Sequence, residues 1–202
     1  MIGSRKDVVR GALYDVAKAN DAVFEEAQLT MDDDGCLVIG EGPAGTTILY
    51  PNGTLGMHVS QMLSANLAAA VFWFHIHDGD LWTYALFDNG EMIDQFSTRP
   101  DYWGEDGGDM GETIAGGDAE EIAKCIPGLS ADNISQYLVV WSDRHYQGGV
   151  LEKAYPADRF HYGEDWQLLD FVAKLGLTYP VDERGATRGE TCRFLPPAGK
   201  WF

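Results

Sequence analysis

The pattern of apolar and polar positions near the start of the chain predicts an amphipathic helix. Ser4 is the expected N-cap, Asp7 stands at the capping-box position, and Asn20 is expected to end the helix. Residues at helical spacing form its apolar face: Val8, Val9, Ala12, Leu13, Val16 and Ala17.

The stretch FWFHIHDGDLWTYALFDNG, residues 72–90, alternates as an antiparallel hairpin does. Phe72, Phe74 and Ile76 should share the core face, because side chains alternate along a strand. The opposite face should carry Val71, Trp73, His75 and His77. Turn signals at Asp78-Gly79 and Asn89-Gly90 then predict a three-stranded meander over residues 71–97.

Weaker patterns predict the other strands of the first half. Strands are expected over 36–39, 46–50 and 55–59, and the last two are separated by the turn signal Pro51-Asn52-Gly53. Residues 23–29 fit a helix or a strand, and residues 60–70 fit a short helix.

The second half of the chain predicts helices and irregular segments. Asp118 should cap a helix that has Glu121 at its third position and is stopped by Pro127-Gly128. Ser130 is the expected cap of another helix, and residues 142–162 are polar and irregular. The apolar positions of that helix are Ile134, Tyr137, Leu138 and Trp141. A late helix ends at Gly176 and has as its apolar positions Trp166, Leu169, Val172 and Leu175.

Strands in the middle and helices at both ends favour the α+β class. We expect an antiparallel β-sheet with a central three-stranded meander, flanked by N- and C-terminal helices. The length of 202 residues and the absence of repeats or a linker pattern predict a single domain over residues 1–202.

Charge narrows the classes of partner. The chain has 32 acidic and 14 basic residues and a formal net charge of −18, which opposes binding to nucleic acid or to an anionic membrane. A basic protein or a divalent cation suits that charge. The first twenty residues lack the apolar core of a signal peptide, and the longest uncharged apolar run, 67–74, is too short to span a membrane. We therefore expect a bacterial-type cytoplasmic protein.

The pair His75 and His77 suggests a metal site. Both imidazoles leave one face of a strand with their Cβ atoms about 7 Å apart. Zinc or iron would need a third ligand, for which the candidates are Asp80, His58, His145 and His161. The same pattern is typical of a polar hairpin end. We favour that interpretation and expect no metal, and a metal-dependent enzyme or metal-binding domain centred on His75 and His77 is the alternative.

Other catalytic and cofactor patterns are weak, so we expect no cofactor. Residues 40–45 match GxGxxG, but a β-type run follows where a dinucleotide site needs a helix, so these glycines predict a loop. Among the three cysteines, Cys192 lies between Arg188 and Arg193 and is the best candidate for a thiolate. The sequence favours a non-catalytic protein and leaves enzymatic activity open.

Residues 101–121 hold eight acidic residues and no Lys or Arg. A solvated loop, a calcium site without the EF-hand order and a docking surface for a basic protein are all compatible with this composition. In a docking surface Tyr102 and Trp103 would be aromatic anchors. The acidic contacts beside them would be Glu105, Asp106, Asp109 and Glu112.

Over residues 72–128 the chain resembles a group of bacterial proteins. The shared order is a meander with NGE.ID.F, then PDYW, an acidic glycine-rich loop and a GGD helix start. Some small acidic bacterial proteins of this style are similar to immunity proteins of polymorphic toxin systems. The resemblance implies an immunity-type protein that neutralises a basic partner, and it carries no catalytic residues. Together with the charge, it predicts a non-catalytic acidic protein-binding module.

Overall fold

The computed structural model describes residues 1–50, 56–102, 116–146, 151–182, 184, 186–195 and 197. Its contacts group the chain into two compact units. The first unit comprises Met1–Phe72, Phe87–Glu91 and Leu175–Phe202, and the second comprises Trp73–Leu86 and Met92–Lys174. The single domain expected from the sequence stays a prediction, and each unit is described by itself.

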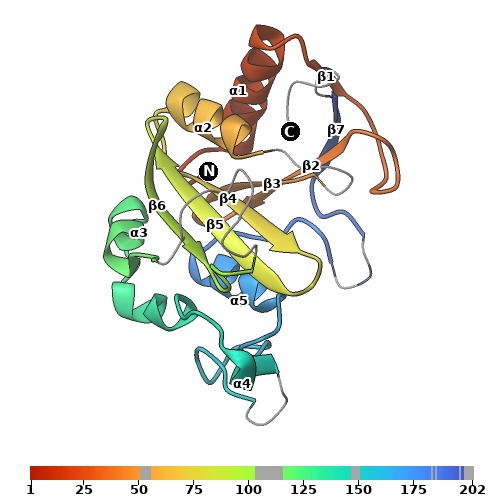
Figure 1. Cartoon of the computed structure of the whole chain (residues 1–202). Coiled ribbons are helices and arrows are strands. Elements are labelled where there is room, and N and C mark those ends of the chain that lie inside the picture. The colour runs from red at the N-terminus through yellow and green to blue at the C-terminus, as the bar shows by residue number, and fades with distance from the viewer. Residues whose placement is uncertain are drawn as a thin grey trace. The chain divides into compact units, whose positions relative to one another are not determined.

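The first unit is built on a four-stranded antiparallel sheet. Its strand order is β1 (Val23–Glu26), β7 (Glu190–Leu195), β2 (Cys36–Gly42) and β3 (Gly45–Leu49) (Figure 1). Strand β7 was not predicted, although Cys192 and Phe194 alternate inward along it. Because β7 pairs with β1 and β2, the C-terminal segment completes a sheet begun at the other end of the chain.

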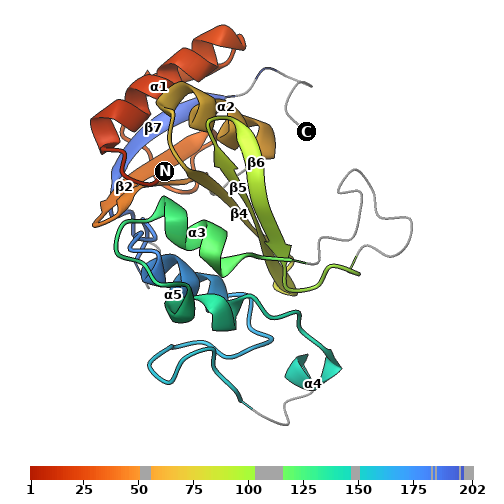
Figure 2. The ribbon, with the colours of Figure 1, turned by 90° about the vertical axis from the view of Figure 1, so that its left-hand side faces the viewer.

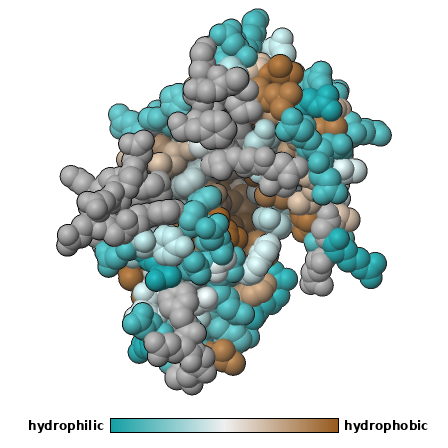
Figure 3. All heavy atoms as spheres, turned by 45° about the vertical axis from the view of Figure 1, so that its right-hand side comes forward, coloured by the Kyte–Doolittle hydropathy of each residue, from teal (hydrophilic) through white to brown (hydrophobic). Residues whose placement is uncertain are grey.

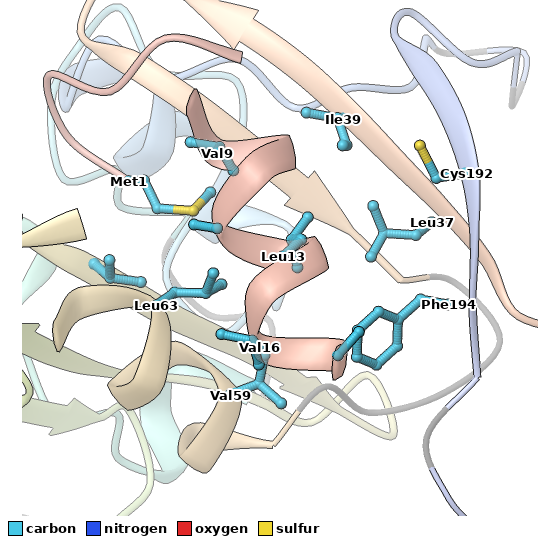
Figure 4. Close-up of a cluster of buried hydrophobic side chains, with 13 residues drawn as sticks. Met1, Val9, Leu13, Val16, Leu37, Ile39, Val59, Leu63, Cys192 and Phe194 are labelled. Atoms are coloured by element: carbon cyan, nitrogen blue, oxygen red, sulfur yellow. The ribbon is translucent and has the colours of Figure 1, made fainter. Parts of the chain in front are cut away.

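Helix α1 (Lys6–Ala19) covers this sheet and packs beside α2 (Met57–Leu67) (Figure 4). The shared core has side chains from both helices and from β2 and β7: Val9, Leu13, Val16, Leu37, Ile39, Val59, Leu63, Cys192 and Phe194. The predicted helix face is confirmed except at Val8, which is 51% exposed. The predicted cap is wrong, because Arg5 is the N-cap and Ser4 Oγ donates to the carbonyl of Ile2.

The predicted meander is confirmed as a second, three-stranded sheet. Its order is β4 (Val71–His77), β5 (Leu81–Asp88) and β6 (Glu91–Ser97). Both turns have the two consecutive positive φ angles of tight hairpins: 48° and 79° at Asp78 and Gly79, and 49° and 84° at Asn89 and Gly90. The α+β class with antiparallel sheets and flanking helices is therefore shown.

Aromatic packing forms the core of the second unit. Phe171, on α5 (Gln167–Lys174), is fully buried. Its ring centroid lies 5.4–6.2 Å from those of four other rings, which come from β4, β5 and the 3-10 turn η2 (Ser135–Tyr137): Phe74, Trp82, Tyr84 and Tyr137. Figure 2 shows other elements of this unit: β6, α3 (Ala119–Cys125), α4 (Asp143–Tyr146) and α5. In the sequence, the 3-10 turns η1 (Ala131–Asn133) and η2 lie between α3 and α4.

Buried carboxylates hold the irregular parts of the second unit. Asp170 accepts hydrogen bonds from the backbone N–H groups of Arg159 and Phe160, at 2.8 and 2.9 Å. Asp158 accepts from the hydroxyl of Tyr137 at 2.8 Å and from the backbone of Tyr155 at 2.9 Å. Each of these bonds satisfies a donor group in an irregular segment, which lacks the regular backbone hydrogen bonds of a long helix or a sheet.

The local predictions had mixed outcomes. Asp118 caps α3 as predicted, because its carboxylate accepts from the N–H groups of Glu120 and Glu121. The helix predicted after Ser130 is wrong, since η1 and η2 replace it. The strand predicted over 55–59 is also wrong, because α2 begins at Met57; the Pro51-Asn52-Gly53 turn lies outside the described residues.

Two further interpretations are corrected. Residues 40–45 form a hairpin of β2 and β3 and not a loop, with only Pro43 and Ala44 in its turn. Trp166, predicted as core, lies just before α5 and is 45% exposed. In the part of the chain that the structure describes, no helix is both long and apolar enough to cross a membrane.

The aromatic core yields a stability prediction. Phe171→Ala should lower the free energy of unfolding by about 3–5 kcal/mol, because it empties the space among four rings. Leu151→Ala is the control in the same unit; since Leu151 is 72% exposed, the loss should stay within about 0.5 kcal/mol. Denaturant titrations of both variants measure the two values. Equal effects would show that Phe171 does not anchor the unit.

Candidate functional site

Three rings lie along one face of β4 at the end where the hairpin turns. The rings of Trp73 and His75 are stacked, with centroids 5.5 Å apart and planes 8° from parallel. The centroid of His77 lies 5.7 Å from that of His75. The rings of His77 and of Tyr102, which follows β6, meet edge to face with their centroids 5.5 Å apart. The alternation predicted from sequence therefore places these side chains together, while Phe74 faces the aromatic core.

Polar contacts extend this row into the turn. His75 Nε2 is 3.5 Å from His77 Nδ1, and His77 Nε2 is 3.4 Å from an oxygen of Asp78. The Tyr102 hydroxyl donates to the Asp80 carboxylate at 2.9 Å. We call these five residues the strand-end cluster: His75, His77, Asp78, Asp80 and Tyr102.

Burial and neighbouring charge set the electrostatics of the cluster. Burial lowers the pKa of His75 below its usual range, and the neighbouring His77 lowers it further. The pKa of Tyr102 is raised because its hydroxyl donates to the Asp80 carboxylate. Burial raises the pKa of Asp165, and the negative charges of Glu164 and Asp80 add to that effect.

The candidate third ligands for the histidine pair lie in other surroundings. His145 Nδ1 accepts a hydrogen bond from the backbone of Ser142 at 2.8 Å, and His161 Nδ1 lies 3.0 Å from Glu164. His58 belongs to α2. Among the residues with a described position, no three His, Cys, Asp or Glu side chains are grouped to hold a metal ion.

Nucleophile patterns receive little support from the geometry. Burial raises the pKa of Cys192, the best thiolate candidate in the sequence, and of Cys36, which disfavours the thiolate form of both. Ser142 Oγ lies 3.4 Å from His145 Nδ1, which resembles a serine–histidine pair. That nitrogen already accepts from the Ser142 backbone N–H and so lacks a free lone pair for a general base.

The residues predicted to contact a partner are only partly described. Tyr102 lies in the strand-end cluster, where Arg99 is 5.0 Å above its ring. The others lie outside the described residues and stay predictions: Trp103, Glu105, Asp106, Asp109 and Glu112. The sequence interpretation missed exposed Trp166, because its spacing also fits the apolar face of α5.

Comparison with known proteins adds no relative. No family model, no curated protein and no solved structure matches the chain. The resemblance to immunity proteins therefore stays a prediction.

The coupling of the two histidines predicts a measurable titration. His75 should titrate below the usual histidine pKa of about 6.5 in NMR spectra of the folded protein. His77→Gln should raise the pKa of His75, because a nearby positive charge is removed, and His58→Gln should leave it unchanged. A His75 pKa at or above 6.5 in the wild-type protein would contradict this account.

The same shift has a consequence for stability. Because the folded-state pKa of His75 is lowered, the unfolded state takes up its proton first as the pH falls below about 6.5. The neutral form of His75 therefore contributes to the free energy of unfolding at neutral pH. This contribution is lost as the pH falls from about 6.5 to the folded-state pKa of His75. Urea titrations across this pH range should show that acidification lowers the free energy of unfolding less in His75→Gln than in the wild-type protein. An identical pH dependence in the two proteins would contradict the linkage.

Proposed function

We propose that this protein is a non-catalytic, acidic module that binds a basic protein through its second unit, as an immunity-type protein that neutralises a toxin would. The proposal places it in a bacterial-type cytoplasm. Its main support is the division of charge between the units.

The negative charge is concentrated in the second unit. This unit is about half of the chain but holds 18 of the 32 acidic residues and six of the 14 basic ones, so it carries 12 of the 18 net negative charges. Figure 3 shows hydrophilic side chains over much of the described surface on one face of the molecule. The net negative charge of the second unit would accelerate its encounter with a cationic protein.

The basic residues of the second unit contact groups inside the same unit. Lys124 pairs with Glu121, Arg159 with Asp170, and Arg144 donates to His145. Lys153 donates to the carbonyl of Asp158. The other two cations lie over aromatic rings, Arg99 over Tyr102 and Lys174 over Tyr155. These internal contacts leave an excess of carboxylates that a basic partner could neutralise.

Two aromatic residues of the second unit directly follow acidic residues in the sequence. Tyr102 follows the exposed Asp101, and Trp166 follows Asp165. Amphipathic rings of this kind supply most of the binding energy in many protein interfaces, whereas charges at the rim act mainly on the association rate. The described surface therefore offers both the steering charge and the anchors that the proposal needs.

The alternative function is a metal-dependent enzyme centred on His75 and His77. Metal-assisted hydrolysis usually uses three protein ligands and an open position for water. The described residues bring two imidazoles together, which supports metal binding better than it supports catalysis.

The proposed function is tested with two variants, each of which lacks four negative charges in a different unit. One variant replaces Glu105, Asp106, Asp109 and Glu112 with Ser. A matched variant removes an equal number of negative charges from exposed positions of the first unit, by changing to Ser the residues Asp15, Asp32, Asp34 and Glu91. Partners are recovered from the native cell, and surface plasmon resonance at low and high salt then measures their association rates with the wild-type protein and both variants.

The first variant should lower the association rate with the recovered partner about tenfold at low salt, and the matched variant should lower it much less. High salt should reduce the difference, because it screens exposed charges. Equal rates for the wild-type protein and the first variant at both salt concentrations would contradict electrostatic docking. Equal losses in the two variants would assign the effect to net charge and not to the second unit.

A further inference from the structure

We propose that His75 and His77 form a two-nitrogen binding site for a borderline divalent transition-metal ion such as Cu²⁺, Ni²⁺ or Zn²⁺, with water or a further ligand in the remaining positions. The inference goes beyond the proposed function and does not depend on it.

The spacing of the two nitrogens fits one shared ion. His75 Nε2 and His77 Nδ1 are 3.5 Å apart. Two histidine nitrogens that bind one tetrahedral zinc at 2.0–2.1 Å lie about 3.3 Å from each other. A shift of a few tenths of an ångström would therefore bring both to a common ion.

Asp78 occupies the outer position that metal-binding histidines usually require. Its carboxylate lies 3.4 Å from His77 Nε2, the ring nitrogen that does not face His75. A carboxylate only accepts, so Asp78 favours the His77 tautomer with the proton on Nε2, in which Nδ1 is the nitrogen that can coordinate an ion. Such outer carboxylates orient the ring and strengthen the ligand.

Neighbouring aromatic rings hold both imidazoles in place. Trp73 is stacked on His75, and the rings of Tyr102 and His77 meet edge to face. Both histidines stand on one regular strand, β4, so little conformational freedom is lost when they bind an ion. The His77 side chain is 25% exposed, which leaves it accessible from solvent.

The ligand set selects among cations. Imidazole suits copper, nickel and zinc, and the affinity for divalent ions rises to a maximum at Cu²⁺. Calcium and magnesium prefer oxygen ligands and should not compete for two nitrogens. Cu²⁺ is therefore the most sensitive probe.

Calorimetric titration of the full chain with Cu²⁺ tests the site, in an excess of Mg²⁺ that occupies the acidic residues. We expect one equivalent to bind with the highest affinity and to quench the tryptophan fluorescence, because Trp73 is stacked on a ligand. His75→Gln and His77→Gln should each weaken this step at least tenfold, and Asp78→Asn about tenfold. His145→Gln is the control and should not change it.

A second pair of variants separates the histidine site from the acidic segment. Trp73→Phe should bind the same equivalent with less quenching. The variant lacking Glu105, Asp106, Asp109 and Glu112 should keep the step. Retention of the tight step in both His75→Gln and His77→Gln, with circular dichroism spectra like the wild type, would overturn the proposal. Its loss in the acid-depleted variant alone would assign the ion to the carboxylates and also overturn it.

Discussion

The ring of Phe171 determines which face of the β4–β5 hairpin packs against α5. It packs between Trp82 and Tyr84 on β5 and Phe74 on β4, so these side chains must point toward α5. Because side chains alternate along a strand, the neighbours of Phe74 are forced to the opposite face. The row of Trp73, His75 and His77 is therefore a geometric consequence of the aromatic core.

Much of the local structure could be predicted because its causes lie close together in the sequence. The turns at Asp78-Gly79 and Asn89-Gly90 need positive φ angles, and the cap of α3 needs a carboxylate at Asp118. Strand β7 was missed because its partners lie about 150–170 residues away in the chain, and no local signal specifies that pairing. The helix expected after Ser130 failed because its residues form two short 3-10 turns.

The candidate site could be predicted from the sequence only in part. A common face for His75 and His77 follows from the period of the strand, whereas the approach of Tyr102 depends on how the chain returns after β6. The Tyr102 contact with Asp80 then joins the segment after β6 to the β4–β5 turn, so Tyr102, the described member of the proposed docking surface, lies beside the histidine pair. A cation on one and a basic protein on the other are separate ligands with separate chemistry.

The central claim is that carboxylates of the second unit face a basic partner. Carbodiimide cross-linking joins a carboxylate directly to a lysine amine, so mass spectrometry of the cross-linked native complex locates the interface. The account predicts cross-links from carboxylates of the second unit, among them Glu105, Asp106, Asp109 and Glu112 and the exposed Asp78, Asp80, Asp101 and Glu164. Cross-links confined to carboxylates of the first unit, such as Asp15 and Asp32, would contradict it.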